Sequence, residues 1–157
     1  MLIDTSALLR TLQVRHPEYS AIKRALELLP EQGRSLHVVP QVLVEFWVVA
    51  TRPLQQNGLG LTPLETIAEM DRIKAMFVLL PETPAIYPTW ELLVTQHAVS
   101  GKPSHDARLV AAMKVHGLTA VLTFDRTGFS RFPGIEVVHP ADVPWNAIRR
   151  ASSPSIT

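Results

Sequence analysis

Five short apolar runs, set among segments with helical patterns, constrain the fold of this chain more than any other feature. The runs are MLID, LHVV, FVLL, TAVLTF and IEVVH. Continuous apolar strands that alternate with helices are typical of a parallel sheet covered on both faces. The sequence therefore predicts an α/β fold, with a three-layer α/β/α sandwich and a central parallel sheet of four or five strands.

Helix start and stop signals lie between these runs. Asp4 or Ser6 can cap a helix in DTSALLRTL, and Ser104 can cap another in SHDARLVAAMKVHG. TPLE is a capping box with proline at the first helical position. Pro30 and Gly33 are expected to end a helix that begins near residue 19. Further helices are predicted at 40–51, at 62–76, with apolar residues 64, 67, 70, 73 and 77 on one side, and at 85–99.

Length and composition indicate one globular domain. The chain has 157 residues, of which 46% are hydrophobic and 18% charged, and we place the folded domain at 1–140. The pattern fades in 141–157, which we expect to be a partly disordered tail. The absence of cysteine excludes disulfides, zinc–thiolate sites and Cys nucleophiles. No signal peptide or membrane span is recognisable, so we expect a cytoplasmic protein with no membrane partner.

Glu45 is the carboxylate that the local pattern explains least. It lies in the apolar stretch VPQVLVEFWVVAT, and no Lys or Arg is three or four residues away on the expected helix. A glutamate in such a helix must reach the rim, or be paired, protonated or bound to a metal when buried.

Three other acids are placed where they could meet it. Asp4 and Asp125 directly follow predicted strands, and ligands of open parallel sheets bind outside the carboxyl ends of the strands. Asp106 begins a helix on its core-facing side. Taken singly, Asp4 and Asp106 fit ordinary helix starts and Asp125 fits an ordinary turn. Together they predict one acidic cluster with Glu45, which a cation must stabilise against its own repulsion.

Oxygen ligands without cysteine suit Mg²⁺ or Mn²⁺. Such an ion can bind phosphate oxygens and lower the pKa of a water that attacks phosphorus. The four acids therefore predict metal-dependent phosphoester hydrolysis.

Four segments in order, LIDTSALL, VLVEFW, HDARLVAAMKVHG and LTFDRTGFSRFPGIEVVHP, resemble the motif regions of the PIN-domain family. The resemblance extends from residue 1 to about residue 140 and is strongest to the VapC-like ribonucleases of bacterial toxin–antitoxin pairs. It implies a PIN-like α/β fold, Mg²⁺ or Mn²⁺ held by acids, and cleavage of RNA. It also implies a small antitoxin protein as partner and a homodimer.

The family's acidic positions fall on Asp4, Glu45, Asp106 and Asp125. The resemblance makes Asp4, Asp106 and Asp125 metal ligands, with Glu45 binding the ion directly or through a water. Its hydroxyl positions fall on Thr5, Ser6 and Thr123, of which Ser6 and Thr123 are candidates for orienting a water or a carboxylate.

Two other functions stay open at this point. A non-catalytic PIN-like module that binds RNA or protein could retain the acids, and a metal-dependent phosphohydrolase of small phosphate esters would use the same chemistry. The net charge of +1 gives no general argument for a polyanion partner. Any RNA-binding strip is expected to be local and to draw on Arg10, Arg108 or Arg126.

Overall fold

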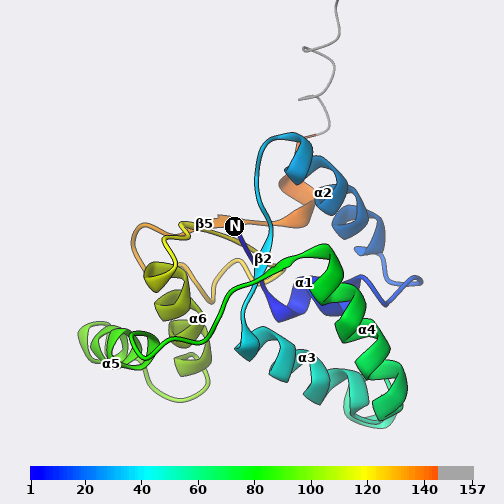
Figure 1. Cartoon of the computed structure of the whole chain (residues 1–157), viewed down its shortest axis with the longest axis horizontal. Coiled ribbons are helices and arrows are strands. Elements are labelled where there is room, and N and C mark those ends of the chain that lie inside the picture. The colour runs from blue at the N-terminus through cyan, green and yellow to red at the C-terminus, as the bar shows by residue number, and fades with distance from the viewer. Residues whose placement is uncertain (145–157) are drawn as a thin grey trace, which may run out of the picture.

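The computed structural model describes residues 1–144. Its elements follow in the order β1 (Leu2–Ile3), α1 (Thr5–Arg10), α2 (Tyr19–Glu31), β2 (His37–Val38), α3 (Pro40–Thr51), the 3-10 helix η1 (Leu54–Gln56), α4 (Pro63–Met76), β3 (Val78–Leu79), α5 (Ile86–Gln96), α6 (Ser104–Val115), β4 (Ala120–Leu122), β5 (Glu136–Val138) and the 3-10 helix η2 (Pro140–Asp142) (Figure 1). The predicted α/β fold with a central parallel sheet is confirmed.

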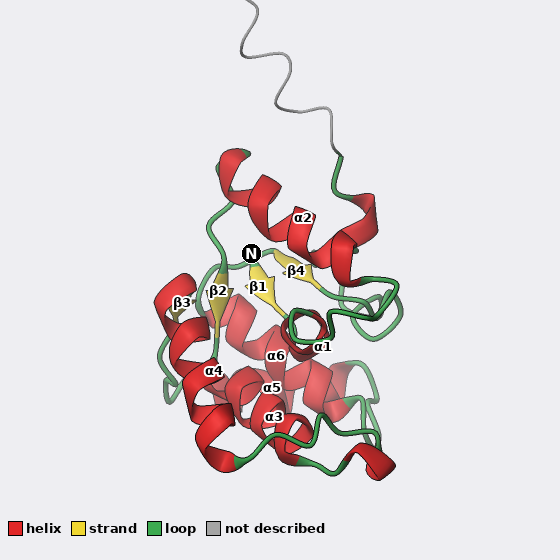
Figure 2. Cartoon of the chain, turned by 90° about the vertical axis from the view of Figure 1, so that its right-hand side faces the viewer, coloured by secondary structure: helices red, strands yellow, loops and turns green. Residues whose placement is uncertain are grey.

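The sheet has five parallel strands in the order β3-β2-β1-β4-β5. The chain moves outward from β1 to β2 and β3, then returns to place β4 on the other side of β1. This reversal between β1 and β4 is a topological switch point, where ligands of open parallel sheets bind. Helix α2 lies above the strands in Figure 2, whereas α3, α5 and α6 lie below them.

The core consists of the strands and the helices packed against them. The largest fully buried side chains are Phe46, Phe129, Phe132, Leu2, Ile3, Leu8, Ile22, Leu29, Ile86, Leu109, Met113 and Leu122. Val143 is also buried and belongs to this core, so packed structure continues past residue 140. The predicted tail from residue 145 onward lies outside the described residues. No helix in residues 1–144 is long and apolar enough to cross a membrane.

Helix ends follow the sequence signals in part. Asp4 caps α1, and Thr62 and Glu65 form the predicted capping box of α4. The prediction that Pro30 ends α2 is wrong, because the helix includes it and ends at Glu31. A proline in the last turn removes only one helical hydrogen bond. Gly33 ends the helix instead, at a φ of +77° that suits glycine.

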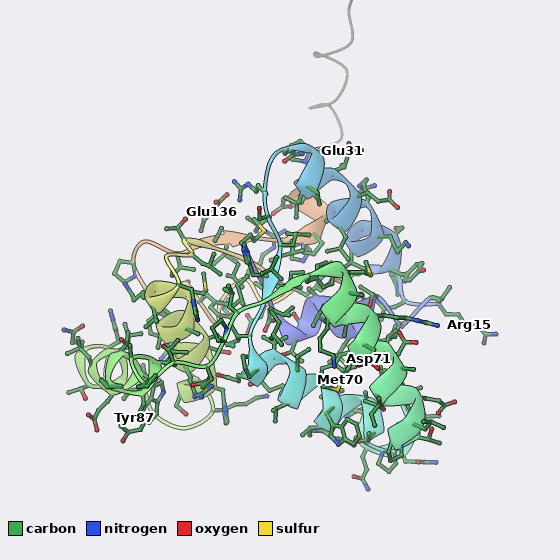
Figure 3. The ribbon with its side chains drawn as sticks, in the orientation of Figure 1. Arg15, Glu31, Met70, Asp71, Tyr87 and Glu136 are labelled. Atoms are coloured by element: carbon green, nitrogen blue, oxygen red, sulfur yellow. The ribbon has the colours of Figure 1, made fainter. Side chains whose placement is uncertain are left out.

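Two further expectations about helices are wrong. Pro103, not Ser104, is the N-cap of α6, and Ser104 is its first helical residue. On α4, Leu64 and Ile67 are 79% and 48% exposed. Thr66 takes the buried position, because its hydroxyl donates to the Thr62 carbonyl at 2.9 Å and so needs no water. The buried side of α4 continues along residues 70, 73 and 77, and Met70 packs against the core (Figure 3).

Candidate functional site

Asp4 lies directly after β1, at the switch point. Its backbone N–H donates to the carbonyl of Leu122, the last residue of β4, at 3.0 Å. The residue is only 9% exposed. The sheet therefore fixes this carboxylate beside the loop that follows β4.

One oxygen of Asp4 is held by two hydroxyl groups. Oδ2 accepts hydrogen bonds from Ser6 Oγ at 2.6 Å and Thr123 Oγ1 at 2.8 Å. The Thr123 hydroxyl also accepts from the Asp125 N–H at 3.0 Å, and the Ser6 hydroxyl accepts from the Phe124 N–H at 3.2 Å. Within residues 1–144, no hydrogen bond reaches Asp4 Oδ1. Ser6 and Thr123 thus orient the carboxylate and leave one oxygen for another partner.

Asp125 is held in the same one-sided way. Its Oδ1 accepts from Thr127 N at 2.9 Å, from Thr127 Oγ1 at 2.9 Å and from Gly128 N at 3.0 Å. These donors, led by the Thr127 N–H, lower the pKa of the Asp125 carboxyl, and the charge of Lys102 acts in the same direction. No hydrogen bond from the described part of the chain reaches Asp125 Oδ2.

Gly128 marks the point where two of the acids converge. A Cβ atom built on it would lie 2.8 Å from Asp125 Oδ2 and 3.1 Å from Asp106 Oδ2. The side chain that is missing at Gly128 is therefore what lets these two carboxylates face the same small space. In the sequence, nothing but its place in the turn DRTG distinguishes Gly128.

Asp106 lies in the first turn of α6 and is half-buried. Burial raises the pKa of its carboxyl above the ordinary value, and the negative charges of Asp4, Asp125 and Glu45 raise it further; His105 acts in the opposite direction. In the described residues, no hydrogen bond stabilises this carboxylate. The structure thus brings the four predicted acids into one electrostatic neighbourhood, with Asp106 the least compensated.

Glu45 lies half-buried on α3 and is paired with neutral donors instead of a cation. Thr5 Oγ1 donates to its Oε2 at 2.7 Å, and Gln41 Nε2 donates to its Oε1 at 2.8 Å. Gln41 is the residue four positions earlier on the same helical face. These two bonds explain how the apolar helix tolerates the carboxylate, and they occupy both of its oxygens once.

The cluster offers the oxygen ligands that a Mg²⁺ or Mn²⁺ ion prefers. As they stand, no three or more Asp, Glu or His side chains of residues 1–144 form a group that could hold a metal ion. The free oxygens of Asp106 and Asp125 nevertheless face the same small space beside Gly128, and burial, together with the negative charges of Asp4, Asp125 and Glu45, raises the pKa of Asp106. These carboxylates are ligands of the kind that such an ion binds, but their side chains would have to move closer together to bind it.

The three arginines expected in an RNA-binding strip have partners within the chain. Arg10 lies 3.3 Å from Glu18 and over the ring of Phe124. Arg126 pairs with Asp142. Arg108 donates to Glu82 and to Gln41, and Gln41 is itself bonded to Glu45.

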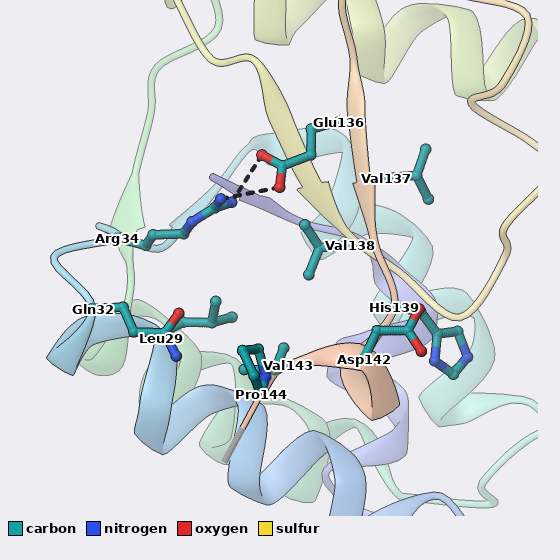
Figure 4. A pocket seen from close by; sticks show the side chains of 10 residues that line it. All are labelled: Leu29, Gln32, Arg34, Glu136, Val137, Val138, His139, Asp142, Val143 and Pro144. Atoms are coloured by element: carbon teal, nitrogen blue, oxygen red, sulfur yellow. Dashed lines mark hydrogen bonds and ion pairs between the residues drawn. The ribbon is translucent and has the colours of Figure 1, made fainter. Parts of the chain in front are cut away.

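A separate pocket lies between α2, β5 and η2 (Figure 4). Its lining includes Leu29, Val138 and Val143, and the paired side chains of Arg34 and Glu136, which are joined by two hydrogen bonds of 3.0 Å. None of the four acids lines it. The candidate functional site, the acidic cluster, therefore lies outside this pocket.

Comparison with known proteins agrees with the resemblance in the sequence. The family model of the PIN domain matches residues 1–135. No curated protein matches the sequence.

Solved structures share the fold at low sequence identity. VapBC2 from Rickettsia felis, bound to a fragment of promoter DNA, aligns with a TM-score of 0.66 and 13% identity over 88% of this chain and 96% of that chain. DNA-bound VapBC from Salmonella typhimurium aligns with a TM-score of 0.66 and 17% identity, with the same two coverages. VapC20 from Mycobacterium tuberculosis, a toxin that cleaves the sarcin-ricin loop, aligns with a TM-score of 0.58 and 19% identity over 81% of this chain and 91% of that chain. Since the family model spans most of the sequence, this protein belongs to the PIN-domain family.

Proposed function

We propose that this protein is a Mg²⁺- or Mn²⁺-dependent endoribonuclease that acts as the toxin of a toxin–antitoxin pair. The observation that carries the proposal is the convergence of Asp4, Glu45, Asp106 and Asp125 at the switch point of the sheet, three of them with unpaired oxygens. Buried, uncompensated negative charge is costly, and a divalent cation offsets it. One structural neighbour is a toxin that cleaves the sarcin-ricin loop, and this supports RNA as the substrate.

Each residue has a role in this proposal that follows from its contacts. Asp4 presents Oδ1 because Ser6 and Thr123 hold Oδ2. Asp125 presents Oδ2 because its own loop holds Oδ1.

Asp106 completes the ligand set from α6. Glu45, fixed by Thr5, contacts the ion directly or orients a water beside it. When bound, the ion supplies positive charge for the phosphate oxygens and lowers the pKa of the attacking water.

The partners are proposed from the neighbours. Several of these are chains of toxin–antitoxin complexes, so we propose a small antitoxin that covers the acidic cluster and blocks it. We also propose a cytoplasmic location and a homodimer.

Lys102 is exposed and its charge acts on Asp125, so we propose that it contacts an RNA phosphate. It has no ion pair with any carboxylate of residues 1–144.

RNA cleavage tests the proposal. The purified protein is incubated with single-stranded and structured RNA in Mg²⁺, Mn²⁺ or EDTA, beside Asp4→Asn and Asp106→Asn variants whose folding is checked by circular dichroism. We expect cleavage that needs the ion and is lost in both variants. Full activity in both variants or in EDTA contradicts the proposal. Turnover of a small phosphate ester without RNA cleavage indicates the phosphohydrolase, and RNA binding without any turnover indicates the binding module.

A further inference from the structure

The amide of Gln41 connects the two helices that carry Glu45 and Asp106. Nε2 donates to Glu45 Oε1 on α3 at 2.8 Å and to the carbonyl of His105 on α6 at 3.0 Å. His105 directly precedes Asp106. Both N–H groups of one amide are therefore engaged, one by each helix, at the edge of the acidic cluster.

The orientation of this amide is determined by its neighbours. A carboxylate and a carbonyl only accept hydrogen bonds, so Nε2 must face Glu45 and His105. Arg108 only donates, and its NH1 reaches Gln41 Oε1 at 3.0 Å. Arg108 is in turn held by Glu82, whose Oε1 accepts from NH2 at 2.8 Å. A flip of the amide would break all three bonds of Gln41 at once.

Gln41 holds only one of the two carboxylate oxygens of Glu45, Oε1. Thr5 holds the other oxygen of Glu45 at 2.7 Å, and its own position is fixed in the first turn of α1. Thr5 thus ties Glu45 to the helix that Asp4 caps, and Gln41 ties Glu45 to the helix of Asp106. Without Gln41, Glu45 and Asp106 have no hydrogen-bonded connection in the described structure, and their like charges push them apart.

We propose that Gln41 is a positioning residue that sets the separation of Glu45 and Asp106, and that Arg108 orients its amide for this task. This inference rests on the proposed function, because the separation matters when one ion is shared by the cluster. Side chains that orient metal ligands typically change metal affinity about 10- to 100-fold when they are removed. Loss of the Gln41 amide should therefore weaken ion binding and leave the fold in place.

The direction in which metal affinity changes when Arg108 is removed tests this inference. If its charge were all that mattered, removing a cation near the cluster would tighten binding of a divalent ion. If Arg108 acts by orienting Gln41, removing it should weaken binding. The double variant of both positions should then bind no more weakly than the Gln41 variant alone, because Arg108 acts through Gln41.

The experiment is Mn²⁺ titration of the full chain, with free Mn²⁺ measured by electron paramagnetic resonance. Wild type is compared with Asp106→Asn, Gln41→Leu, Arg108→Met and the Gln41→Leu/Arg108→Met double variant. The control is Gln96→Leu, which changes an exposed glutamine at the end of α5. Melting in EDTA checks that each variant is folded. We expect about tenfold weaker Mn²⁺ binding in Gln41→Leu, weaker binding in Arg108→Met, and wild-type binding in the control.

Unchanged affinity in a folded Gln41→Leu, or tighter binding in Arg108→Met, overturns the inference while the nuclease proposal stands. If Gln41→Leu does not fold, the direction of the Arg108→Met effect decides. Wild type that binds no Mn²⁺, or binding that survives Asp106→Asn, overturns the proposed metal site and this inference with it.

Discussion

Replacement of Gly128 by alanine should disable the site while leaving the fold almost untouched. Gly128 is not among the residues with positive φ, so alanine fits its backbone. The new Cβ would lie 2.8 Å from Asp125 Oδ2 and 3.1 Å from Asp106 Oδ2, and both distances are shorter than ordinary carbon–oxygen contacts. The atoms that must move are the two carboxylates that we propose as ligands.

The magnitude follows from the bonds that hold Asp125. Turning its carboxylate away from the new methyl group strains up to three hydrogen bonds to Oδ1, each worth about 0.5 to 1 kcal/mol. A loss of about 1.5 to 3 kcal/mol in site formation corresponds to roughly a 10- to 100-fold weaker metal affinity. RNA cleavage should fall at least as far.

The assay is isothermal titration with Mn²⁺, combined with urea unfolding in EDTA. Gly134→Ala is the matched control, because Gly134 has a φ of +83° and nothing within 4 Å of its added Cβ. Alanine there should cost about 1 kcal/mol of folding stability through backbone strain and leave Mn²⁺ affinity unchanged. Wild-type affinity in Gly128→Ala, or an equal loss in Gly134→Ala, refutes the reasoning.

Three further predictions concern the same cluster. Because the pKa of Asp106 is raised in the folded protein, the folded state holds its proton more tightly than the unfolded state. The stability of the metal-free protein should therefore fall as pH rises from about 4 through the raised pKa. Urea unfolding at a series of pH values should show this fall in the wild type and not in Asp106→Asn. Thr123→Val should lower the folding stability by about 2 kcal/mol and weaken metal binding, because it leaves the buried Asp4 carboxylate and the Asp125 N–H short of a partner. Thr123→Ser, which keeps the hydroxyl, should retain both the stability and the metal binding. Equal behaviour of the two variants in unfolding and titration would contradict this. Lys102→Ala should weaken RNA binding and reduce its salt dependence by about one phosphate contact, as measured by fluorescence anisotropy at several salt concentrations; an unchanged slope would exclude the contact.

The sequence predicted those parts of the structure that depend on local chemistry. The five strands are apolar runs in the chain, and the Asp4 cap and the Thr62–Glu65 box are hydrogen bonds between near neighbours. The expectation that Asp4 and Asp125 share one edge followed from the parallel arrangement of strands. Because β1 and β4 are neighbours in the sheet, the two acids follow adjacent strands.

The residues that the sequence did not reveal depend on distant parts of the chain. Gly128 looks like a turn residue until Asp106 is placed opposite it. In the sequence, Gln41 is only an uncharged residue four positions before Glu45, but its amide contacts residues 64 and 67 positions further along the chain. The exposed Leu64 and Ile67 were misassigned because helical spacing alone does not fix which side of α4 meets the core.

The most direct test of the metal centre is an anomalous difference map from crystals of the protein grown with Mn²⁺. We predict a manganese peak bounded by carboxylate oxygens of Asp4, Asp106 and Asp125, with Glu45 beside it directly or through a water, and no such peak in Asp106→Asn crystals. A manganese peak elsewhere, or none at this cluster at millimolar Mn²⁺, would contradict it.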